Sequence, residues 1–297
     1  MTLRLASAPC TWGVWERTVD RDDLIPPGLM LSTVKELGYT GIELGPPGYL
    51  GDGPDAVLAT LAPYELQMVG AFAPIRIADD DGFREDLAFV DQTIAVLAAT
   101  GAHGPIVLAA DENDERLRVA GRPDARAATS LSADEMKAAG RRVEHAAERA
   151  RAAGVTAAFH PHTATYIEGP EEVAAFLDAT DPELVKITFD TGHCIVGGGD
   201  PVAFVKEFGD RIAHLHLKDV DQSVLDRVRS QELTVEQAWE SGLFCEFGTG
   251  AVDFAAVLDA LPGYAGWAVV EQDRVAVQVD DLPAVRAVEE RNIAALG

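Results

Sequence analysis

Two stretches of the sequence decide the fold: Val185-Lys-Ile-Thr-Phe-Asp190-Thr-Gly-His193 and Arg211-Ile-Ala-His-Leu-His216-Leu-Lys-Asp219. Each begins with a short, mostly apolar run that is typical of a strand, and each ends in histidine and acidic residues. Between them, Asp200 followed by Pro201 predicts the N-cap and the first residue of a helix. The order strand, helix, strand predicts two parallel strands joined by a crossover helix.

Similar runs recur along the whole chain. Several are almost continuously apolar instead of alternating, which is typical of parallel strands that are covered on both faces. The predicted strands are Leu3–Ser7, Gly41–Leu44, Gln67–Phe72, Pro105–Ala109, Val155–Phe159, Val185–Phe189, Ile212–Leu217 and Trp267–Glu271.

Helix signals fill the segments between these strands. Apolar residues at spacings of three and four predict a helix over Phe83–Thr100, which Gly101 ends. Ser132 and Glu135 form a capping box before a long helix that runs to Ala153. Further helices are predicted after Thr234 with Gln237, over Phe254–Leu261 with Asp253 as N-cap, and over Leu282–Leu296.

Eight strand–helix alternations in 297 residues predict an α/β protein with a (β/α)8 TIM barrel fold, in a single domain that spans residues 1–297. A doubly wound open sheet is the competing arrangement. It usually has a glycine-rich turn after the first strand, and Ala8-Pro-Cys-Thr-Trp-Gly13 is not such a turn.

The composition excludes several classes of function. The chain carries 24 Lys and Arg against 49 Asp and Glu, a formal net charge of −25, which disfavours nucleic acid as a partner. No apolar run is long enough to span a membrane, and the first residues lack the apolar core of a signal peptide. Three scattered cysteines cannot form a disulfide framework. We therefore expect a soluble cytoplasmic protein.

Functional residues of a TIM barrel lie at the carboxyl ends of its strands. Five of the seven histidines fall at such positions here, together with several carboxylates. The last four barrel strands each contribute one candidate metal ligand, and these are His160, Asp190, His216 and Glu271. Two imidazoles and two carboxylates suit Mn²⁺ or Co²⁺, with Zn²⁺ and Fe²⁺ as alternatives and Mg²⁺ less favoured because it prefers oxygen ligands.

Other residues at strand ends are candidates for substrate binding. They are Trp12, Glu43, His162, His193, Lys218 and Asp219. Each also has a structural interpretation: Trp12 and Phe72 either pack in the barrel or form a platform for a sugar ring, and Glu43 either faces substrate or caps a loop amide. His214 and His216 lie on one strand face, where one can support the other.

The motifs from strand five onward resemble those of the xylose isomerase-like superfamily of sugar isomerases, epimerases and dehydratases. Within that superfamily, they resemble the inosose dehydratase (2-keto-myo-inositol dehydratase) family. The matching motifs are Phe159-His160-Pro-His162, Phe189-Asp190-Thr-Gly-His193, Arg211-Ile-Ala-His-Leu-His216-Leu-Lys218-Asp219, Phe244-Cys-Glu-Phe-Gly248-Thr-Gly250-Ala-Val-Asp253-Phe and Gly266-Trp267-Ala-Val-Val-Glu271-Gln272.

The resemblance places Asp190, His216 and Glu271 on the family's metal-ligand positions. At the strand-five position, epimerases and isomerases of the superfamily usually have Glu, and this chain has His160. Those epimerases use two metal-linked glutamates on opposite faces of the substrate. One carboxylate base with imidazoles suits a one-way elimination better. His162 is an alternative ligand, because the dehydratases also carry adjacent histidines there.

The resemblance therefore implies a metal-dependent lyase of inositol catabolism. It would dehydrate a cyclic keto-polyol such as scyllo-inosose, with Glu271 as the base and His193 as the proton donor to the departing hydroxyl. The alternatives are an isomerase or epimerase of sugars or keto-polyols, and more remotely an abasic-site endonuclease or a non-catalytic sugar-binding barrel. The superfamily often forms dimers or tetramers, so a homo-oligomer is one expected assembly. The segment 111–129 has no recognisable motif, and a lid or an insertion that binds a partner are the two interpretations of it.

Overall fold

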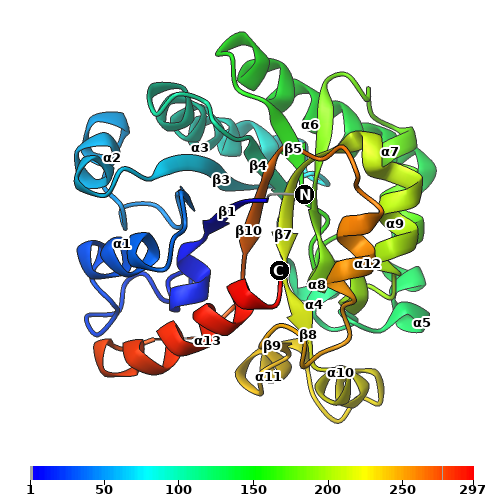
Figure 1. Ribbon diagram of the computed structural model, residues 1–297. Coiled ribbons are helices and arrows are strands. Elements are labelled where there is room, and N and C mark those ends of the chain that lie inside the picture. Colours follow the sequence, from blue (N-terminus) through cyan, green and yellow to red (C-terminus); the bar gives the residue numbers. More distant parts are fainter. Residues whose placement is uncertain (1–2, 276) are drawn as a thin grey trace.

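Eight parallel strands close into a barrel in the computed structural model, which describes residues 3–275 and 277–297. Their order around the barrel is β1-β10-β7-β6-β5-β4-β3-β2 (Figure 1), and the predicted TIM barrel is confirmed. The barrel strands are β1 (Arg4–Ser7), β2 (Gly41–Glu43), β3 (Gln67–Ile75), β4 (Ile106–Ala110), β5 (Ala157–Phe159), β6 (Val185–Asp190), β7 (Ile212–Leu217) and β10 (Trp267–Val270).

All eight barrel strands were predicted, with differences at their ends. β3 continues past Phe72, because Pro74 and Ile75 still pair with Ala109 and Ala110 of β4. β5 begins at Ala157, two residues later than predicted. Most side chains of these strands are buried, because the barrel interior lies on one face and the surrounding helices on the other.

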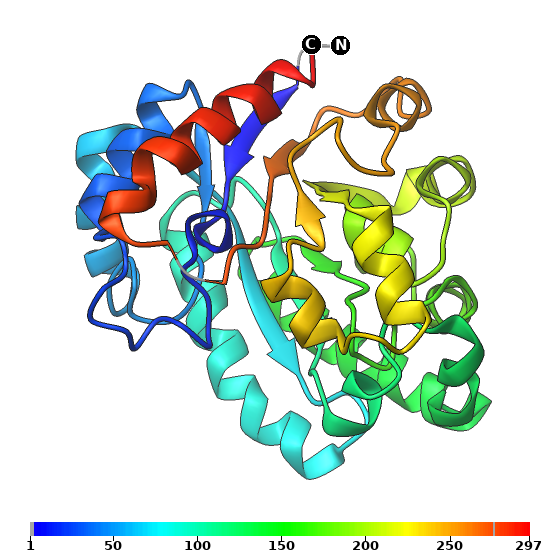
Figure 2. The same cartoon turned by 90° about the horizontal axis from the view of Figure 1, so that it is seen from below.

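Helices surround the barrel in both views (Figures 1 and 2). The α-helices are α1 (Pro27–Glu36), α2 (Pro54–Leu61), α3 (Asp80–Ala99), α4 (Asp114–Leu117), α5 (Pro123–Arg126), α6 (Ala133–Ala152), α7 (Pro170–Asp178), α8 (Thr191–Val196), α9 (Pro201–Phe208), α10 (Gln222–Arg229), α11 (Val235–Glu240), α12 (Phe254–Asp259) and α13 (Leu282–Ala294). Short 3-10 helices occupy Pro9–Trp12, Ala62–Tyr64, Ala127–Thr129, Gly209–Arg211 and Val279–Asp281.

The predicted helix caps are present. The Asp200 side chain accepts a hydrogen bond from the backbone N–H of Val202 at the start of α9. Ser132 with Glu135 forms the expected capping box of α6, and Thr234 with Gln237 forms that of α11. Local hydrogen bonding therefore sets these helix starts, as the sequence predicted.

An insertion follows β7. It contains the helix predicted after Thr234, which is α11, and three elements that the sequence did not predict. β8 (Asp219–Val220) pairs antiparallel with β9 (Phe244–Cys245), and α10 and α11 lie between them in the chain. Figure 1 shows these four elements gathered at one end of the molecule. Their apolar residues, among them Leu225, Val228 and Ala238, belong to a small cluster that also contains Val196 of α8.

The segment 111–129 is folded against the barrel and contains α4 and α5. The buried Arg116 guanidinium donates to both carboxylate oxygens of Glu172 on α7, at 2.9 and 2.8 Å. The buried Arg126 guanidinium lies 3.3 Å from the Glu172 carboxylate and 3.6 Å from that of Glu168. These buried ion pairs fix the segment to α7, so it is an ordered part of the barrel's rim.

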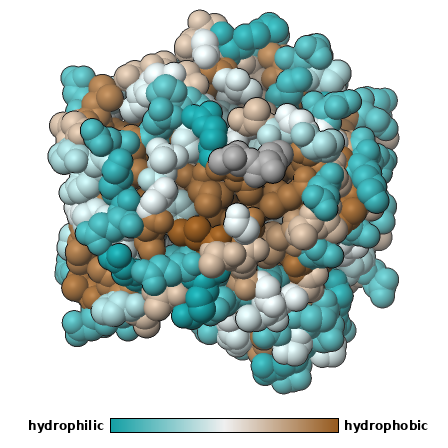
Figure 3. Space-filling view, in the orientation of Figure 1, coloured by the Kyte–Doolittle hydropathy of each residue, from teal (hydrophilic) through white to brown (hydrophobic). Residues whose placement is uncertain are grey.

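Figure 3 shows apolar residues gathered near the middle of one face of the molecule, with polar residues around them. Among residues 3–275 and 277–297, none of the helices has the length and apolar character needed to cross a bilayer.

Candidate active site

The carboxyl ends of the barrel strands surround a cavity of about 380 Å³. This is the end of a TIM barrel at which substrates bind. The predicted site residues that line the cavity are Glu43, His160, His162, His193, His216, Lys218 and Glu271.

Three of the four predicted metal ligands lie around one ring nitrogen of the fourth, Nδ1 of His216. It lies 3.1 Å from His160 Nε2, 3.3 Å from Glu271 Oε2 and 3.8 Å from Asp190 Oδ2. All four side chains are at most 5% exposed. Ligand atoms of His160, Asp190 and His216 all lie within 4.8 Å of one another, which is close enough for one ion, whereas Glu271 approaches this group only at His216 Nδ1.

Asp190 supports the same conclusion. Its Oδ1 accepts from the backbone N–H of His193, whereas its buried Oδ2 accepts no hydrogen bond. A buried carboxylate oxygen in this state is stabilised by positive charge, which the Lys218 ammonium supplies at 3.3 Å and a bound cation would increase. The residues present therefore fit a divalent metal ion, although the structure does not establish which one.

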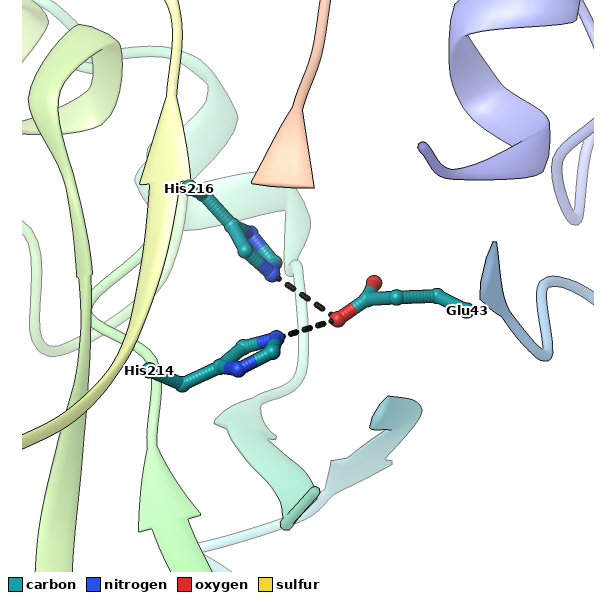
Figure 4. A group of neighbouring side chains, drawn as sticks. All are labelled: Glu43, His214 and His216. Carbon is teal, nitrogen blue, oxygen red and sulfur yellow. Dashed lines mark hydrogen bonds and ion pairs between the residues drawn. The ribbon is translucent and has the colours of Figure 1, made fainter. Parts of the chain in front are cut away.

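Glu43 reaches across the barrel from β2 to two histidines of β7 (Figure 4). Its Oε1 accepts from Nε2 of His214 at 2.7 Å and from Nε2 of His216 at 3.1 Å. These are hydrogen-bond distances. A proton on Nε2 of His216 leaves the Nδ1 lone pair free to face His160, Asp190 and Glu271, so Glu43 orients His216 as a ligand.

The pKa values show that this part of the cavity favours positive charge. Burial disfavours the charged form of His216, but the Glu271 and Glu43 carboxylates outweigh burial and raise its pKa to about 9. Burial likewise works against ionised Asp190, but the nearby positive charge, above all that of Lys218, overcomes it and holds the pKa of Asp190 well below its ordinary value. At neutral pH the His216 ring therefore carries a proton on both nitrogens, and a metal held at Nδ1 would displace one of them, whereas the ionised carboxylates supply the negative charge that a cation needs.

Comparison with known proteins identifies the family. The model of the xylose isomerase-like TIM barrel family matches residues 31–290. The chain belongs to this family. It is 29% identical over 283 residues to an inosose dehydratase of Geobacillus kaustophilus, an alignment that covers 91% of this chain and 87% of that protein. It is 33% identical over 282 residues to the rhizopine catabolism protein MocC of Rhizobium meliloti, covering 92% of this chain and 82% of that one.

A solved structure of the IolI protein with a bound zinc atom has the same fold. It superposes with a TM-score of 0.71 at 16% identity, over 99% of this chain and 98% of that one. The resemblance of the sequence to this family and to inosose dehydratases is thus confirmed. The relatives named inosose dehydratase are enzymes, which confirms the prediction of an enzyme.

In this xylose isomerase-like barrel, Lys218 lies at the edge of the ligand cluster. Its buried Nζ is 3.0 Å from Glu271 Oε2, 3.3 Å from Asp190 Oδ2 and 3.0 Å from Asp273 Oδ2. Burial would lower the pKa of Lys218, but the Asp190 and Asp273 carboxylates outweigh it and raise that pKa well above its usual value. The ammonium therefore stays charged beside the carboxylates.

His193 lies in the first turn of α8, behind the ligand cluster. Its Nδ1 is 2.8 Å from Thr163 Oγ1, and its ring lies 3.8 Å from the ring of His162, centre to centre. Burial, and then the neighbouring His162, hold the pKa of His193 well below its ordinary value. His193 is therefore neutral at ordinary pH, and a proton that reaches it, for example from the Lys218 ammonium 3.4 Å from its Nε2, is readily given up.

Two predicted substrate-binding residues lie elsewhere. Trp12 is fully buried in the core, where its indole N–H donates to Ser7 Oγ at 3.0 Å, so packing is its role. Asp219 is also fully buried. Its carboxylate accepts from the backbone N–H groups of Gly248 and Gly250 at 2.9 and 3.0 Å, and it thereby orders the loop after β9 instead of facing the cavity.

Other residues line the cavity without having been predicted. Arg17 pairs with Glu112 at 2.6 Å and with Glu236 at 2.9 Å. The rings of Trp15 and Trp239 lie beside it, 6.3 Å apart. The place of Trp15 just after the first strand was a usable signal. Trp239 had none, because only the tertiary structure brings α11 over the barrel.

Proposed function

We propose that this protein is a metal-dependent lyase that dehydrates a cyclic keto-polyol such as scyllo-inosose. The observation that carries the proposal is the meeting of His160, Asp190 and Glu271 at Nδ1 of His216, with a charged Lys218 and His193 beside them. The similarity to proteins named inosose dehydratase supports the choice of substrate.

A divalent ion held by the four ligands would polarise the ketone and a neighbouring hydroxyl of the substrate. Glu271 removes the proton from the carbon next to the ketone, and burial aids this role because it raises the carboxyl pKa. His193 gives a proton to the departing β-hydroxyl, which leaves as water. Lys218 and His162 hold polyol hydroxyls at the cavity wall.

The residue at the end of β5 favours elimination over epimerisation. Epimerisation of a carbon next to a ketone needs a proton acceptor on one face and a proton donor on the other. His160 stands at the β5 position, and burial lowers its pKa, so a second carboxylate partner for Glu271 is missing there. Loss of the hydroxyl is then the outcome that these residues support.

The test is an NMR time course of scyllo-inosose in D₂O with protein loaded with Mn²⁺, with Co²⁺ or with Zn²⁺. Aliquots of the Mn²⁺ reaction are freed of metal before recording, and a chelated sample is the control. We expect metal-dependent loss of the β-hydroxyl and formation of a dione. Deuterium uptake or an epimer without loss of water would instead indicate an isomerase.

A variant tests the role of Glu271. We expect Glu271→Gln to lose at least about a hundredfold in rate even at metal occupancy equal to that of the wild type, because the base is gone. Glu183→Gln, at an exposed position on another side of the barrel, is the matched control. Near-normal turnover by Glu271→Gln would remove this role.

A further inference from the structure

The cavity has a buried inner end and an exposed mouth. The ligand cluster at the inner end is at most 5% exposed, whereas the side chain of Arg17 is 42% exposed and that of its partner Glu112 is 27% exposed. Trp15 and Trp239 are partly buried and line the same cavity. These four residues, Trp15, Arg17, Glu112 and Trp239, make up what we name the outer wall.

The outer wall joins three separate parts of the chain. Trp15 and Arg17 follow β1, Glu112 begins the segment after β4, and Trp239 comes from α11 in the insertion after β7. The Trp15 indole N–H also donates to the backbone carbonyl of Val275 after β10, at 3.2 Å. The indole ring of Trp15 is therefore fixed in place at the mouth, and the ring of Trp239 packs edge-on against it.

The volume of the cavity is larger than a single six-membered polyol ring requires. Cavities of about 300–1,000 Å³ hold drug-sized ligands, and this one is about 380 Å³. A single six-membered polyol ring is smaller than such ligands. With that ring at the metal ligands, space remains between it and the outer wall.

The charges of the outer wall disfavour an anionic group in that space. The single guanidinium of Arg17 is already paired with the carboxylates of Glu112 and Glu236. Asp111 adds a further acidic side chain to the cavity lining, and the other guanidinium of the lining, that of Arg274, is itself paired with Glu289 at 3.2 Å. A phosphate or carboxylate would meet net negative charge here, whereas an uncharged ring can pack its C–H face on an indole.

We infer that the outer wall is a second-ring subsite, which binds an uncharged sugar ring attached to the keto-polyol and has Trp239 as its specificity-determining residue. This inference rests on the proposed function, because it assumes that the keto-polyol ring occupies the metal end. It assigns a role to the insertion after β7, which carries Trp239 to the mouth of the cavity.

Tryptophan fluorescence can report binding without turnover. The chain has four tryptophans, and Trp12 and Trp267 are at most 3% exposed and do not line the cavity. A change of emission on binding therefore comes from Trp15 or Trp239. The probes are myo-inositol and galactinol, its galactoside, titrated into zinc-loaded protein. Neither has a ketone, so neither can react.

We expect galactinol to bind about tenfold or more tightly than myo-inositol, which corresponds to one buried stacking contact. Trp239→Ala should reduce this preference to about threefold or less and leave the affinity for myo-inositol nearly unchanged. Trp239→Phe should keep part of the preference, and Glu240→Ala, an exposed neighbour on α11, should keep all of it.

Equal affinities for the two probes, binding of neither probe, or an unchanged preference in Trp239→Ala would each overturn the inference. The outcome is separable from that of the proposed function. If the protein dehydrates scyllo-inosose but does not prefer galactinol, the inferred subsite is refuted and the proposed function stands. If the protein prefers galactinol but does not dehydrate scyllo-inosose, the subsite is supported and the proposed reaction is refuted.

Discussion

His216 is the residue at which the geometry of the site is set, because both of its ring nitrogens have partners. Nε2 faces Glu43 at 3.1 Å, and Nδ1 faces His160 at 3.1 Å and Glu271 at 3.3 Å. A histidine held in this way by a carboxylate has a fixed tautomer and a fixed ring orientation. Glu43 is therefore a positioning residue for a ligand.

Gly70 on β3 makes room for Glu43. A methyl group at residue 70 would come within 3.2 Å of His214 Nε2 and still closer to the Glu43 carboxylate. We expect Gly70→Ala to displace Glu43 from His216 and to weaken zinc binding about tenfold to a hundredfold, as measured by competition with a chelator. Gly209→Ala is the control, because its methyl group meets only Leu261 at an ordinary 3.6 Å. Equal zinc affinity in both variants would contradict this role.

Asp111, which also lines the cavity, lowers the stability of the fold in a pH-dependent way. Burial raises its pKa to about 6, above the ~3.9 of an unfolded chain. The folded state therefore holds this proton more tightly, and ionisation destabilises the fold as the pH rises through about 6. The cost is absent below about pH 4.

We expect Asp111→Asn to raise the free energy of unfolding by about 1 kcal/mol near pH 8, a value reduced for the partial exposure of the group. The gain should shrink as the pH falls towards about 4.5, because the wild-type carboxyl is then protonated in the folded state. Denaturant unfolding at both pH values measures the effect. A gain that is the same at both would show that ionisation of Asp111 is not its cause.

At the scale of elements, side chains close to each helix start determine where the helix begins. Ser132 with Glu135 and Asp200 before Pro201 act over three residues or fewer. These boundaries were predictable for that reason. The segment 111–129 differs, because its short helices α4 and α5 are held mainly by partners on α7, although Asn113 also caps α4 locally.

The ion pair between Arg116 and Glu172 is the strongest candidate for what holds that segment. Arg116 is fully buried, so removing its charge leaves the Glu172 carboxylate buried and only partly compensated by Arg126. We expect Arg116→Met to lower the free energy of unfolding by about 3 kcal/mol in denaturant titration. Arg84→Met removes an exposed ion pair with Asp81, and this variant should change the free energy of unfolding by about 0.5 kcal/mol or less. Similar losses in both variants would rule out a special role for the buried pair.

At the scale of the whole molecule, the ligand cluster links strands that are far apart in the sequence. His160, Asp190, His216 and Glu271 come from the ends of β5, β6, β7 and β10, so they meet only in the closed barrel. A metal bound there stabilises the folded state, because the unfolded chain offers no such set.

We expect zinc at about a hundred times its dissociation constant to add about 2.7 kcal/mol to the free energy of unfolding. A chelator should reverse the gain, which thermal unfolding measures as a shift of Tm. The His216→Ala variant should show little response to zinc, because it lacks the atom on which the other ligands converge. A zinc effect of equal size in that variant would place the ion elsewhere.

The barrel, and the position of the proposed ligands at one of its ends, could be predicted from the sequence for a local reason. Strand periodicity, helix caps and the polar residues that follow each strand are all read within a few residues, and in a TIM barrel every strand end faces one side. His160, Asp190, His216 and Glu271 therefore had to share one end of the barrel once the strands were placed.

Only the tertiary structure decided which partner each side chain has. Trp12 and Asp219 follow strands as Trp15 and Lys218 do, yet both turn into the interior, because Ser7 and the N–H groups of the loop after β9 satisfy their polar atoms. Glu43 and Trp239 reach the site from elements distant in the chain. Such contacts depend on how the barrel closes and where the insertion packs. The sequence near each residue does not determine which distant residues it will contact.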